Sequence, residues 1–333
     1  MKKFSFLFFG FIFGLFLFGS NLSVFASGTP VATNVTITGT PNVGQTLTWS
    51  YTYTTTNMVW ESVGNIWFSS GEVTYTSLAI DSNNIQYVAY GDGWNWGKAT
   101  VKKYNGTNWE TVGSLGFSSG AVAYTNLAID SNNVPYVAYY DWANSNKATV
   151  MKYNGTNWET VGSLGFSSGS ANYISFAIDK NNVPYISYMD GWNSQKASVM
   201  KFNGTNWEAV GSPGFSSWQA SYTSLAIDSL NNLYILYADV GNSSRASVMK
   251  FNGTNWEAVG SPGFSSAQIV YTSLAIDKNN FLYAAYGDNG NQNRATVMKF
   301  NWTSREVVWV PDFSSGQAYY PSCLLYTSDA ADE

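Results

Sequence analysis

Residues 126–162 read NLAIDSNNVPYVAYYDWANSNKATVMKYNGTNWETVG, and this stretch decides the fold because the chain carries five copies of it. Three series of residues recur at intervals of 49. They are Trp60, Trp109, Trp158, Trp207 and Trp256; Asp81, Asp130, Asp179, Asp228 and Asp277; and Asp92, Asp141, Asp190, Asp239 and Asp288. A repeat of this length that is rich in Trp, Tyr and β-branched residues is typical of the blades of a β-propeller.

Each repeat predicts four short antiparallel strands. In the quoted copy they cover Leu127–Asp130, Pro135–Tyr140, Lys147–Tyr153 and Trp158–Val161. Asn154-Gly155 predicts a type I′ hairpin turn, in which both central residues have positive φ. The strands are apolar at successive positions rather than at alternate ones, so we expect sheets that are covered on both faces, as in blades packed around an axis. One such sheet would not be stable alone.

The fold class that we predict is an all-β propeller of five complete repeats, with partial blade strands at both ends of the chain. Toward the N-terminus, Thr48–Val63 matches the third and fourth strands of another blade. Toward the C-terminus, the residues from Tyr320 onward match the start of a further innermost strand. The propeller would then span residues 58–322, either closed by a composite sixth blade or as part of a larger ring.

One string within the repeat resembles a known family. Ala226-Ile227-Asp228, followed by Asn232-Leu233-Tyr234 and then by residues 238–245, resembles NHL-type propeller repeats. The resemblance extends over residues 58–303. It implies the fold rather than a function, and the Asp-x-x-Asn-x-x-Lys/Arg spacing is one residue longer here than in the usual NHL form.

The N-terminal residues are not predicted to belong to the propeller. Residues 1–26 have the pattern of a bacterial secretory signal peptide, with Lys2 and Lys3 before an apolar run and a small-x-small sequence ending at Ala26. The run is shorter than the roughly 20 residues that span a bilayer, so we expect cleavage after Ala26 and a secreted or cell-surface protein without a transmembrane span. Residues 27–57 resemble the start of a bacterial Ig-like domain but are too few to form one, so we expect a linker or remnant.

The last residues, Cys323–Glu333, depart abruptly from the repeat. They resemble the conceptual translation of a transposase adapter used in DNA library preparation, and we expect them to be an artefactual tail. Cys323 is the single cysteine of the chain. An exported protein without it would depend on its core rather than on disulfides.

The composition argues against several classes of function. The chain has no histidine, which excludes Ser-His-Asp and Cys-His catalysis and removes the commonest transition-metal ligand. The net charge of −5 argues against a nucleic-acid partner, which calls for a basic surface. We predict no catalytic residue, metal or cofactor.

The candidate binding site is the loop between the second and third strands of each repeat. Polar groups that can bind sugar hydroxyls and indoles that can stack on sugar rings recur there. The candidate residues are Asp92, Trp94, Asn95, Trp96, Asp141, Trp142, Asn144, Asp190, Trp192, Asn193, Asp239, Asn242, Asp288 and Asn291. The connection to the next repeat lies on the same face and varies too, for example at Trp218, whereas the Ser-Asn-Asn and Asn-Gly turns of the opposite face are uniform.

A structural role competes with the binding role for some of these residues. The Asp could pair with the Lys or Arg six positions later, and the Asn could support an Asx-type turn. The indoles occur in only three repeats and are harder to explain in this way. We expect the Asp81 series to form turns rather than calcium loops, because later ligands are absent. We expect the Trp109 series to pack between blades.

The leading hypothesis is a monomeric, non-enzymatic propeller that binds a glycan or an extracellular protein through this face. Nearly identical repeats argue against an active site, which usually needs a diverged blade. Two alternatives remain open. One is a polysaccharide-active hydrolase or lyase whose catalytic residues lie in blades beyond this sequence, and the other is a structural spacer of a larger surface protein.

Overall fold

The structure is a computed structural model that describes residues 32–38, 48–53, 62–65, 68–301, 304–307 and 317. The chain divides into two compact units, residues 1–62 and 63–333, and we describe each by itself. The expected signal peptide and the expected artefactual tail lie outside the described residues. In the first unit, β1 (Ala32–Thr38) and β2 (Thr48–Tyr53) form a two-stranded antiparallel sheet.

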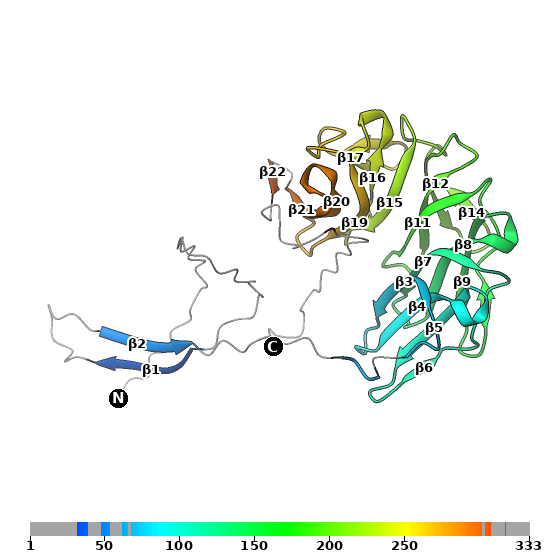
Figure 1. Ribbon diagram of the computed structural model, residues 1–333. Helices are drawn as coiled ribbons and strands as arrows, with labels where there is room; N and C mark the ends of the chain where they lie inside the picture. Colours follow the sequence, from blue (N-terminus) through cyan, green and yellow to red (C-terminus); the bar gives the residue numbers. More distant parts are fainter. Residues whose placement is uncertain are drawn as a thin grey trace. The chain divides into compact units, whose positions relative to one another are not determined.

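The second unit contains five four-stranded antiparallel sheets, and in each sheet strands that are consecutive in sequence are hydrogen-bonded neighbours (Figure 1). Blade 1 consists of β3 (Val73–Ile80), β4 (Gln86–Asp92), β5 (Lys98–Tyr104) and β6 (Trp109–Thr111). Blade 2 consists of β7 (Val122–Ile129), β8 (Pro135–Asp141), β9 (Lys147–Tyr153) and β10 (Trp158–Thr160). Blade 3 consists of β11 (Ala171–Ile178), β12 (Pro184–Asp190), β13 (Lys196–Phe202) and β14 (Trp207–Ala209).

Blade 4 consists of β15 (Ala220–Ile227), β16 (Leu233–Asp239), β17 (Arg245–Phe251) and β18 (Trp256–Ala258). Blade 5 consists of β19 (Ile269–Ile276), β20 (Leu282–Asp288), β21 (Arg294–Asn301) and β22 (Ser304–Val307). The predicted propeller of four-stranded antiparallel blades is confirmed. Contacts between the innermost strands link β3 to β7, β7 to β11, β11 to β15 and β15 to β19.

The prediction of partial blades at both ends is wrong. Within the described residues the propeller has five blades, and β2, which was expected to belong to a further blade, pairs with β1 instead. The reason is that β2 finds its hydrogen-bonding partner within the first unit, so Thr48–Tyr53 is not part of the propeller sheets. The residues from Tyr320 onward lie outside the described part of the chain.

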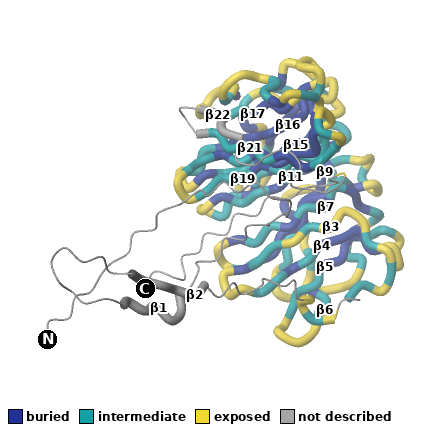
Figure 2. Tube along the Cα trace, turned by 60° about the vertical axis from the view of Figure 1, so that its left-hand side comes forward, coloured by how far each residue is buried: buried dark blue, intermediate teal, exposed yellow. Residues whose placement is uncertain are grey.

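The core lies between neighbouring blades, as the dark blue strands of Figure 2 show. Leu127, Phe176, Leu225 and Leu274 occupy equivalent positions on the innermost strands of blades 2 to 5 and are 6–8% exposed. Leu78, at the same position of blade 1, is 44% exposed because no blade precedes it in the described part of the chain. Burial of this position therefore comes from the preceding blade and not from the sheet that carries the residue.

The Trp109 series joins each blade to the segment before it, which confirms the predicted packing between blades. The indole Nε1 of Trp158 donates to the carbonyl oxygen of Val112 at 2.8 Å, and its ring stacks on Phe117 with centroids 4.2 Å apart. Trp207 and Trp256 repeat this arrangement one and two blades further on. Trp60 lies outside the described residues.

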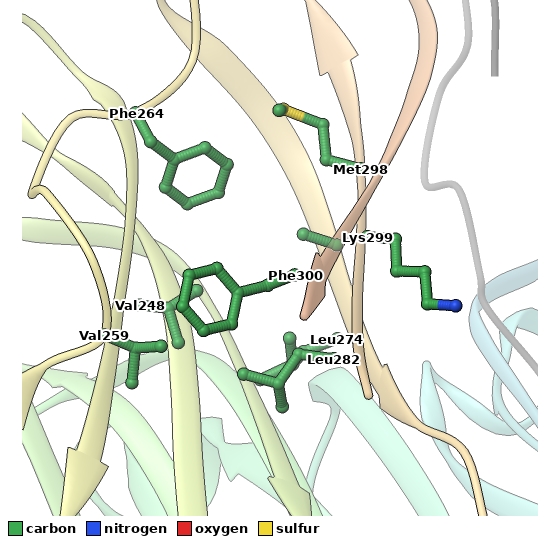
Figure 3. Close-up of a pocket in the computed structure, with 9 residues that line it drawn as sticks. Val248, Val259, Phe264, Leu274, Leu282, Met298, Lys299 and Phe300 are labelled. Atoms are coloured by element: carbon green, nitrogen blue, oxygen red, sulfur yellow. The ribbon is translucent and has the colours of Figure 1, made fainter. Parts of the chain in front are cut away.

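Blade 5 departs from the pattern at two positions. Arg305 replaces the tryptophan, and Ala284 replaces the Val or Ile found at that position of the second strand in the other blades. An apolar cavity of about 20 Å³ lies between blades 4 and 5, lined by Val248, Val259, Phe264, Leu274, Leu282, Ala284, Met298, Lys299 and Phe300 (Figure 3). The smaller side chain and the lost indole explain this cavity as a packing defect.

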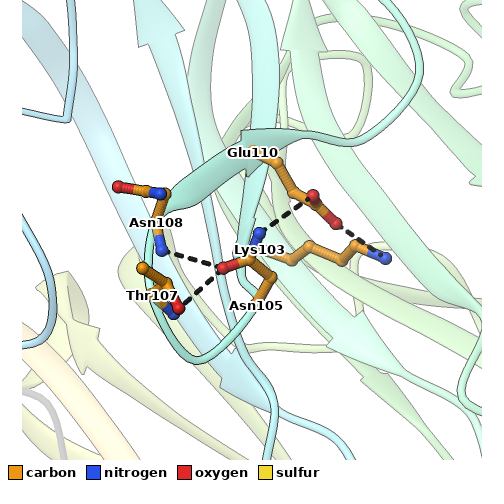
Figure 4. Close-up of polar contacts among 5 residues, drawn as sticks. All are labelled: Lys103, Asn105, Thr107, Asn108 and Glu110. Carbon is orange, nitrogen blue, oxygen red and sulfur yellow. Dashed lines mark hydrogen bonds and ion pairs between the residues drawn. The ribbon is translucent and has the colours of Figure 1, made fainter.

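The hairpin between the third and fourth strands is not the predicted type I′ turn. In blade 1, Gly106 has a φ of 91°, but Asn105 is not among the residues with positive φ. The Asn105 side-chain oxygen instead accepts from the amides of Thr107 and Asn108 at 3.0 and 2.8 Å, while an ion pair of 3.2 Å joins Lys103 to Glu110 (Figure 4). The Asx-type bonds close a four-residue loop, which explains why Asn-Gly-Thr-Asn is repeated as a unit.

Candidate functional site

The loop between the second and third strands is organised by a buried aspartate. In blade 2 the loop forms η2 (Trp142–Asn144), and the carboxylate of Asp141 accepts from the Ala143 amide at 3.1 Å and the Asn144 side chain at 2.7 Å. The hydroxyl of Thr149 donates to the same carboxylate at 2.8 Å and accepts from the Gly165 amide at 2.9 Å. Asp141 thus fixes both the loop and the connection to the next blade.

The same arrangement recurs in blades 1 and 3, whereas in blade 4 no loop amide donates to Asp239, whose buried Oδ1 has no hydrogen-bond partner. Asp92, Asp190 and Asp239 accept from the side chains of Asn95, Asn193 and Asn242, respectively. In blade 5, Asp288 accepts from the Gly290 amide and the Thr296 hydroxyl, and Asn291 lies in the same turn. All five carboxylates are buried, with exposures of 0–6%, so they position the loop rather than face a ligand.

The predicted support of an Asx-type turn by the Asn is confirmed in blades 1 to 3, where the Asp side chain accepts from the turn amide and the Asn donates to the same carboxylate. The expected ion pairs across the loop are not found for blades 1 to 4. Each Asp lies opposite a Lys or Arg in the strand register, as Asp141 does opposite Lys147. Within the described residues, the ion pairs join Lys103 to Glu110 and the equivalent pairs of blades 2 and 3. The Asp charge is held by the neighbouring amides and hydroxyls instead.

The predicted indoles point into solvent. Trp94, Trp96, Trp142 and Trp192 are 63–87% exposed. The structure adds Trp218, which is 64% exposed and lies in the connection before blade 4. Sequence reasoning noted Trp218 as part of a variable connection but did not group it with the loop indoles. The sequence did contain a signal for Trp218, because the residues at the equivalent position of the repeats in blades 1 to 3 are all glycine.

In every blade, one residue of the loop between the second and third strands meets one residue of the connection that precedes the first strand. One of these two residues is always a glycine. A Cβ added to Gly71 would lie 1.6 Å from the ring of Trp94, and one added to Gly241 would lie 1.9 Å from the ring of Trp218. The loop carries the indole in blades 1 and 3, and the connection carries it in blade 4. The five pairs are Gly71/Trp94, Gly120/Ala143, Gly169/Trp192, Trp218/Gly241 and Ala267/Gly290.

This pairing has a direct steric cause. The backbone of the small residue is the surface on which the larger side chain of the pair lies, so two bulky side chains would occupy the same space. In blades 1 and 4 the indole occupies the space that a glycine Cβ would take, while most of the side chain stays exposed to solvent. An exposed indole can stack on the apolar face of a planar or chair-shaped ligand.

The opposite face carries the Asp81 series, whose predicted turn role is confirmed. The Asp130 side chain accepts from the amides of Asn132 and Val134 at 2.9 Å each. The turns also bind each other across blades, since the Ser131 amide donates to the Asn182 side chain at 3.0 Å. Polar clefts of 490–570 Å³ lie between successive blades 1 to 4 on this side, and each contains two lysines.

Neither face shows a cluster that could hold a metal. In the described ranges, no three Asp, Glu, His or Cys side chains lie close enough together to coordinate an ion. No helix in the described part of the chain is long and apolar enough to span a membrane.

The comparisons with known proteins identify the fold but not a family. No family model matches the chain, and no curated protein matches its sequence. Among solved structures, a mutant of AofleA from Arthrobotrys oligospora is similar with a TM-score of 0.54 and 10% identity, over 75% of this chain and 74% of that chain. The Aleuria aurantia lectin AAL is similar with a TM-score of 0.49 and 14% identity, over 70% and 76% of the two chains.

An α-L-arabinanase from Penicillium chrysogenum, complexed with arabinobiose, is similar with a TM-score of 0.52 and 11% identity, over 77% of this chain and 86% of that chain. This finding overturns the expectation that the chain is not an enzyme, because an enzyme is built on the same fold. The repetition of the blades therefore does not exclude catalysis. At these identities the likeness shows the fold alone, a β-propeller.

Proposed function

We propose that the protein binds carbohydrate through the face of the propeller that carries the loop indoles. One observation carries the proposal. The rings of Trp94 and Trp218 lie against the glycine of their pair, the Trp192 backbone and Cβ lie against Gly169, and all three indoles remain 64–75% exposed. Exposed indoles have an energetic penalty in water, and their repeated presentation on a rigid frame is typical of a binding surface.

The polar residues of the same loops have a supporting role in this proposal. Asp92, Asp141, Asp190 and Asp239 are buried and hold the loop backbone, and Asn95, Asn144, Asn193 and Asn242 bind those carboxylates. They fix the height and orientation of the indoles. The proposed contact residues are therefore the tryptophans, with the Asp and Asn residues as positioning groups.

Sugars fit this surface better than other ligands do. The face has no enclosed apolar pocket among the cavities that lie in the described part of the chain, so a small apolar ligand would gain little burial. A pyranose presents an apolar C–H face to an indole while its hydroxyls stay in water. The expected location is outside the cell, where residues 1–26, with the pattern of a leader, would direct the chain.

The test is affinity electrophoresis of the whole chain in gels that contain soluble arabinan, xylan, galactan or mixed-linkage β-glucan. Retardation by at least one polymer is expected. Trp94→Ala, Trp192→Ala and Trp218→Ala should each weaken the retardation, and the triple variant should lose at least about tenfold in affinity. Leu230→Ala, which removes a 69% exposed apolar side chain from a turn of the opposite face, is the matched control and should bind as the wild type does.

Equal migration of the wild type and the triple variant in every gel would contradict the proposal. Thermal unfolding of each variant shows whether a change in migration has a structural cause. The exposed positions should tolerate alanine with little change, since surface substitutions usually alter stability by less than about 0.5 kcal/mol.

A second candidate function is hydrolysis of a polysaccharide. It is favoured by the fold shared with an arabinanase, a protein that acts on arabinan. Release of reducing ends from the same four polymers would reveal it. Hydrolysis needs two carboxyl groups on opposite sides of the scissile bond. Binding without release of reducing ends would leave carbohydrate recognition as the function.

A further inference from the structure

Five tyrosines that the sequence did not single out occupy the same unusual position in the five blades. They are Tyr75, Tyr124, Tyr173, Tyr222 and Tyr271, and their φ values lie between 49° and 54°. Each sits in a β-bulge near the start of the innermost strand, as the register shift between Ala123 and Asn126 shows for blade 2. The innermost strand has an extra residue there relative to its neighbour.

The backbone of these positions does not favour tyrosine. A bulky residue is strained in the left-handed region, whereas Gly, Asn and Asp enter it readily. The chain itself uses Asn for this conformation in the turns of the opposite face, for example at Asn133, with a φ of 61°. The tyrosine must therefore contribute something that Asn does not, and the bulge directs its side chain.

The tyrosine rings contact one another in series. Their centroids are 5.4 Å apart from Tyr75 to Tyr124, 5.3 Å from Tyr124 to Tyr173, 4.6 Å from Tyr173 to Tyr222 and 5.2 Å from Tyr222 to Tyr271. We call these five residues the tyrosine arc. Aromatic pairs of this kind are stabilising, which offsets the backbone strain. Tyr75, at the first end of the arc, is 41% exposed.

The tyrosine arc lies at the same end of the blades as the indoles. Val122 of the innermost strand is paired with Asp141, the residue that begins the loop of blade 2, and Tyr124 follows two positions later. A continuous line of rings then connects the arc to the loop. Tyr124 contacts Tyr140 edge-on at 6.0 Å, and Tyr140 contacts Trp142 edge-on at 6.3 Å.

We propose that the tyrosine arc is the inner part of the carbohydrate site and that the ligand is an extended polysaccharide chain rather than a terminal sugar. The inference rests on the proposed function of the indole face. A series of four ring-to-ring steps is longer than one monosaccharide, and it continues outward to Trp142. Phenol rings offer both an apolar face and a hydroxyl, the two features that successive sugar units would meet.

The exposure of the indoles leads to the same ligand class. Each indole covers only one side of one sugar, so a single sugar would bind weakly. A chain that contacts several rings at once gains by effective concentration, because each further contact is intramolecular. Affinity should therefore rise with the number of sugar units until the row of rings is filled.

The experiment measures this dependence on chain length by isothermal titration calorimetry. The probes are the dimer, tetramer and octamer of whichever of the four polysaccharides retards the wild type. The wild type should bind the octamer at least about tenfold more tightly than the dimer. Tyr173→Asn with Tyr222→Asn keeps a residue suited to the left-handed conformation and removes two rings, so this gain should be lost. Tyr173→Phe with Tyr222→Phe keeps the rings and should retain most of the gain.

A second variant covers the case in which the double Asn variant does not fold. Tyr75→Asn removes the exposed terminal ring, which has one neighbour in the arc, and should reduce octamer affinity several-fold without lowering the unfolding temperature by more than a few degrees. Leu230→Ala is the control.

The two proposals fail in different ways. No wild-type binding to any polymer would overturn both. Weaker binding by the tryptophan variants, together with equal affinity of the wild type for dimer and octamer, would overturn the tyrosine proposal alone. Unchanged octamer affinity in the folded Asn variants would also overturn the tyrosine proposal alone.

Discussion

The indole of Trp158 in blade 2 donates a 2.8 Å hydrogen bond to the carbonyl oxygen of Val112, the residue that follows the last strand of blade 1. The two residues are 46 apart in sequence and belong to different blades. The same ring stacks on Phe117 of the connection and contacts Tyr153 of its own hairpin. Blades 2, 3 and 4 are thus each attached to the preceding blade by a tryptophan side chain, and these blades should unfold together.

Trp158→Phe tests this attachment. The variant keeps an aromatic ring beside Phe117 but loses the donor and leaves the Val112 carbonyl without it, so we expect a loss of about 1–3 kcal/mol in the free energy of unfolding. Urea denaturation followed by circular dichroism measures it. Trp142→Phe is the control, because that indole is exposed and should contribute little. Equal stability of the two variants would show that the bond across the blades has no net effect.

Gly120 and Ala143 test the steric rule for loop and connection. A Cβ added to Gly120 would lie 2.8 Å from the Cβ of Ala143. Gly120→Trp should therefore destabilise the protein by about 1–3 kcal/mol. The double variant Gly120→Trp/Ala143→Gly recreates the Trp218/Gly241 pair of blade 4 and should recover most of that loss.

A thermodynamic cycle that includes Ala143→Gly alone gives the coupling, expected at about 1–2 kcal/mol. Additive effects would mean that the two positions are independent. The double variant should also add an exposed indole to the loop face and so strengthen polysaccharide retardation.

The defect in blade 5 can be repaired by restoring the repeat. Arg305 stands where the other blades have tryptophan, opposite Phe300 in the strand register. Arg305→Trp should place an indole beside Phe264 with the Val259 carbonyl as acceptor, and so raise the unfolding free energy by about 1–2 kcal/mol. Arg305→Ala is the control and should not stabilise. Differential scanning calorimetry distinguishes the two, and equal midpoints would contradict the account of the cavity.

High pH should unfold the protein through its buried tyrosines. Burial raises the pKa of Tyr90 and of Tyr234 to about 12, with nearby aspartates adding to the shift. Burial raises the pKa of Tyr139 and Tyr188 further in the same direction. In the unfolded chain these phenols have a pKa of about 10.

The sign of the effect follows from proton binding. Below about pH 10 both states keep the phenol protons and the stabilisation is complete. At higher pH the unfolded chain releases them while the folded protein retains them, so stability should fall by up to about 1.4 kcal/mol per pH unit for each fully buried tyrosine. Absorbance of tyrosinate should rise together with loss of the circular dichroism signal. Gradual ionisation of all tyrosines before unfolding would contradict this prediction.

The aspartate turns could be predicted from the sequence because their hydrogen bonds are local. Asp130 accepts from amides two and four residues later, so its turn depends on nearby chain only. The Asn-Gly turn was interpreted wrongly for a related reason. Asn105 can bind the amides of Thr107 and Asn108, and these Asx-type bonds compete with the two-residue turn that the dipeptide alone favours.

Other features depend on segments that are distant in sequence. The competition between Gly71 and Trp94 becomes visible only when strand pairing brings the loop against the connection. The tyrosine arc was missed because Tyr124 appears in the sequence as an ordinary strand residue. Its bulge and its ring contacts with Tyr75 and Tyr173 arise from the pairing of strands and the packing of neighbouring blades.

By itself, the sequence determined the repeat, the four strands of each blade and the burial of both sheet faces, because strand patterning and spacing are properties of each copy. The tertiary structure decided the number of blades, the burial of the loop carboxylates and the assembly of indoles and tyrosines on one face. The physical reason is that these depend on which groups a neighbouring sheet covers, as the difference between buried Leu127 and exposed Leu78 shows.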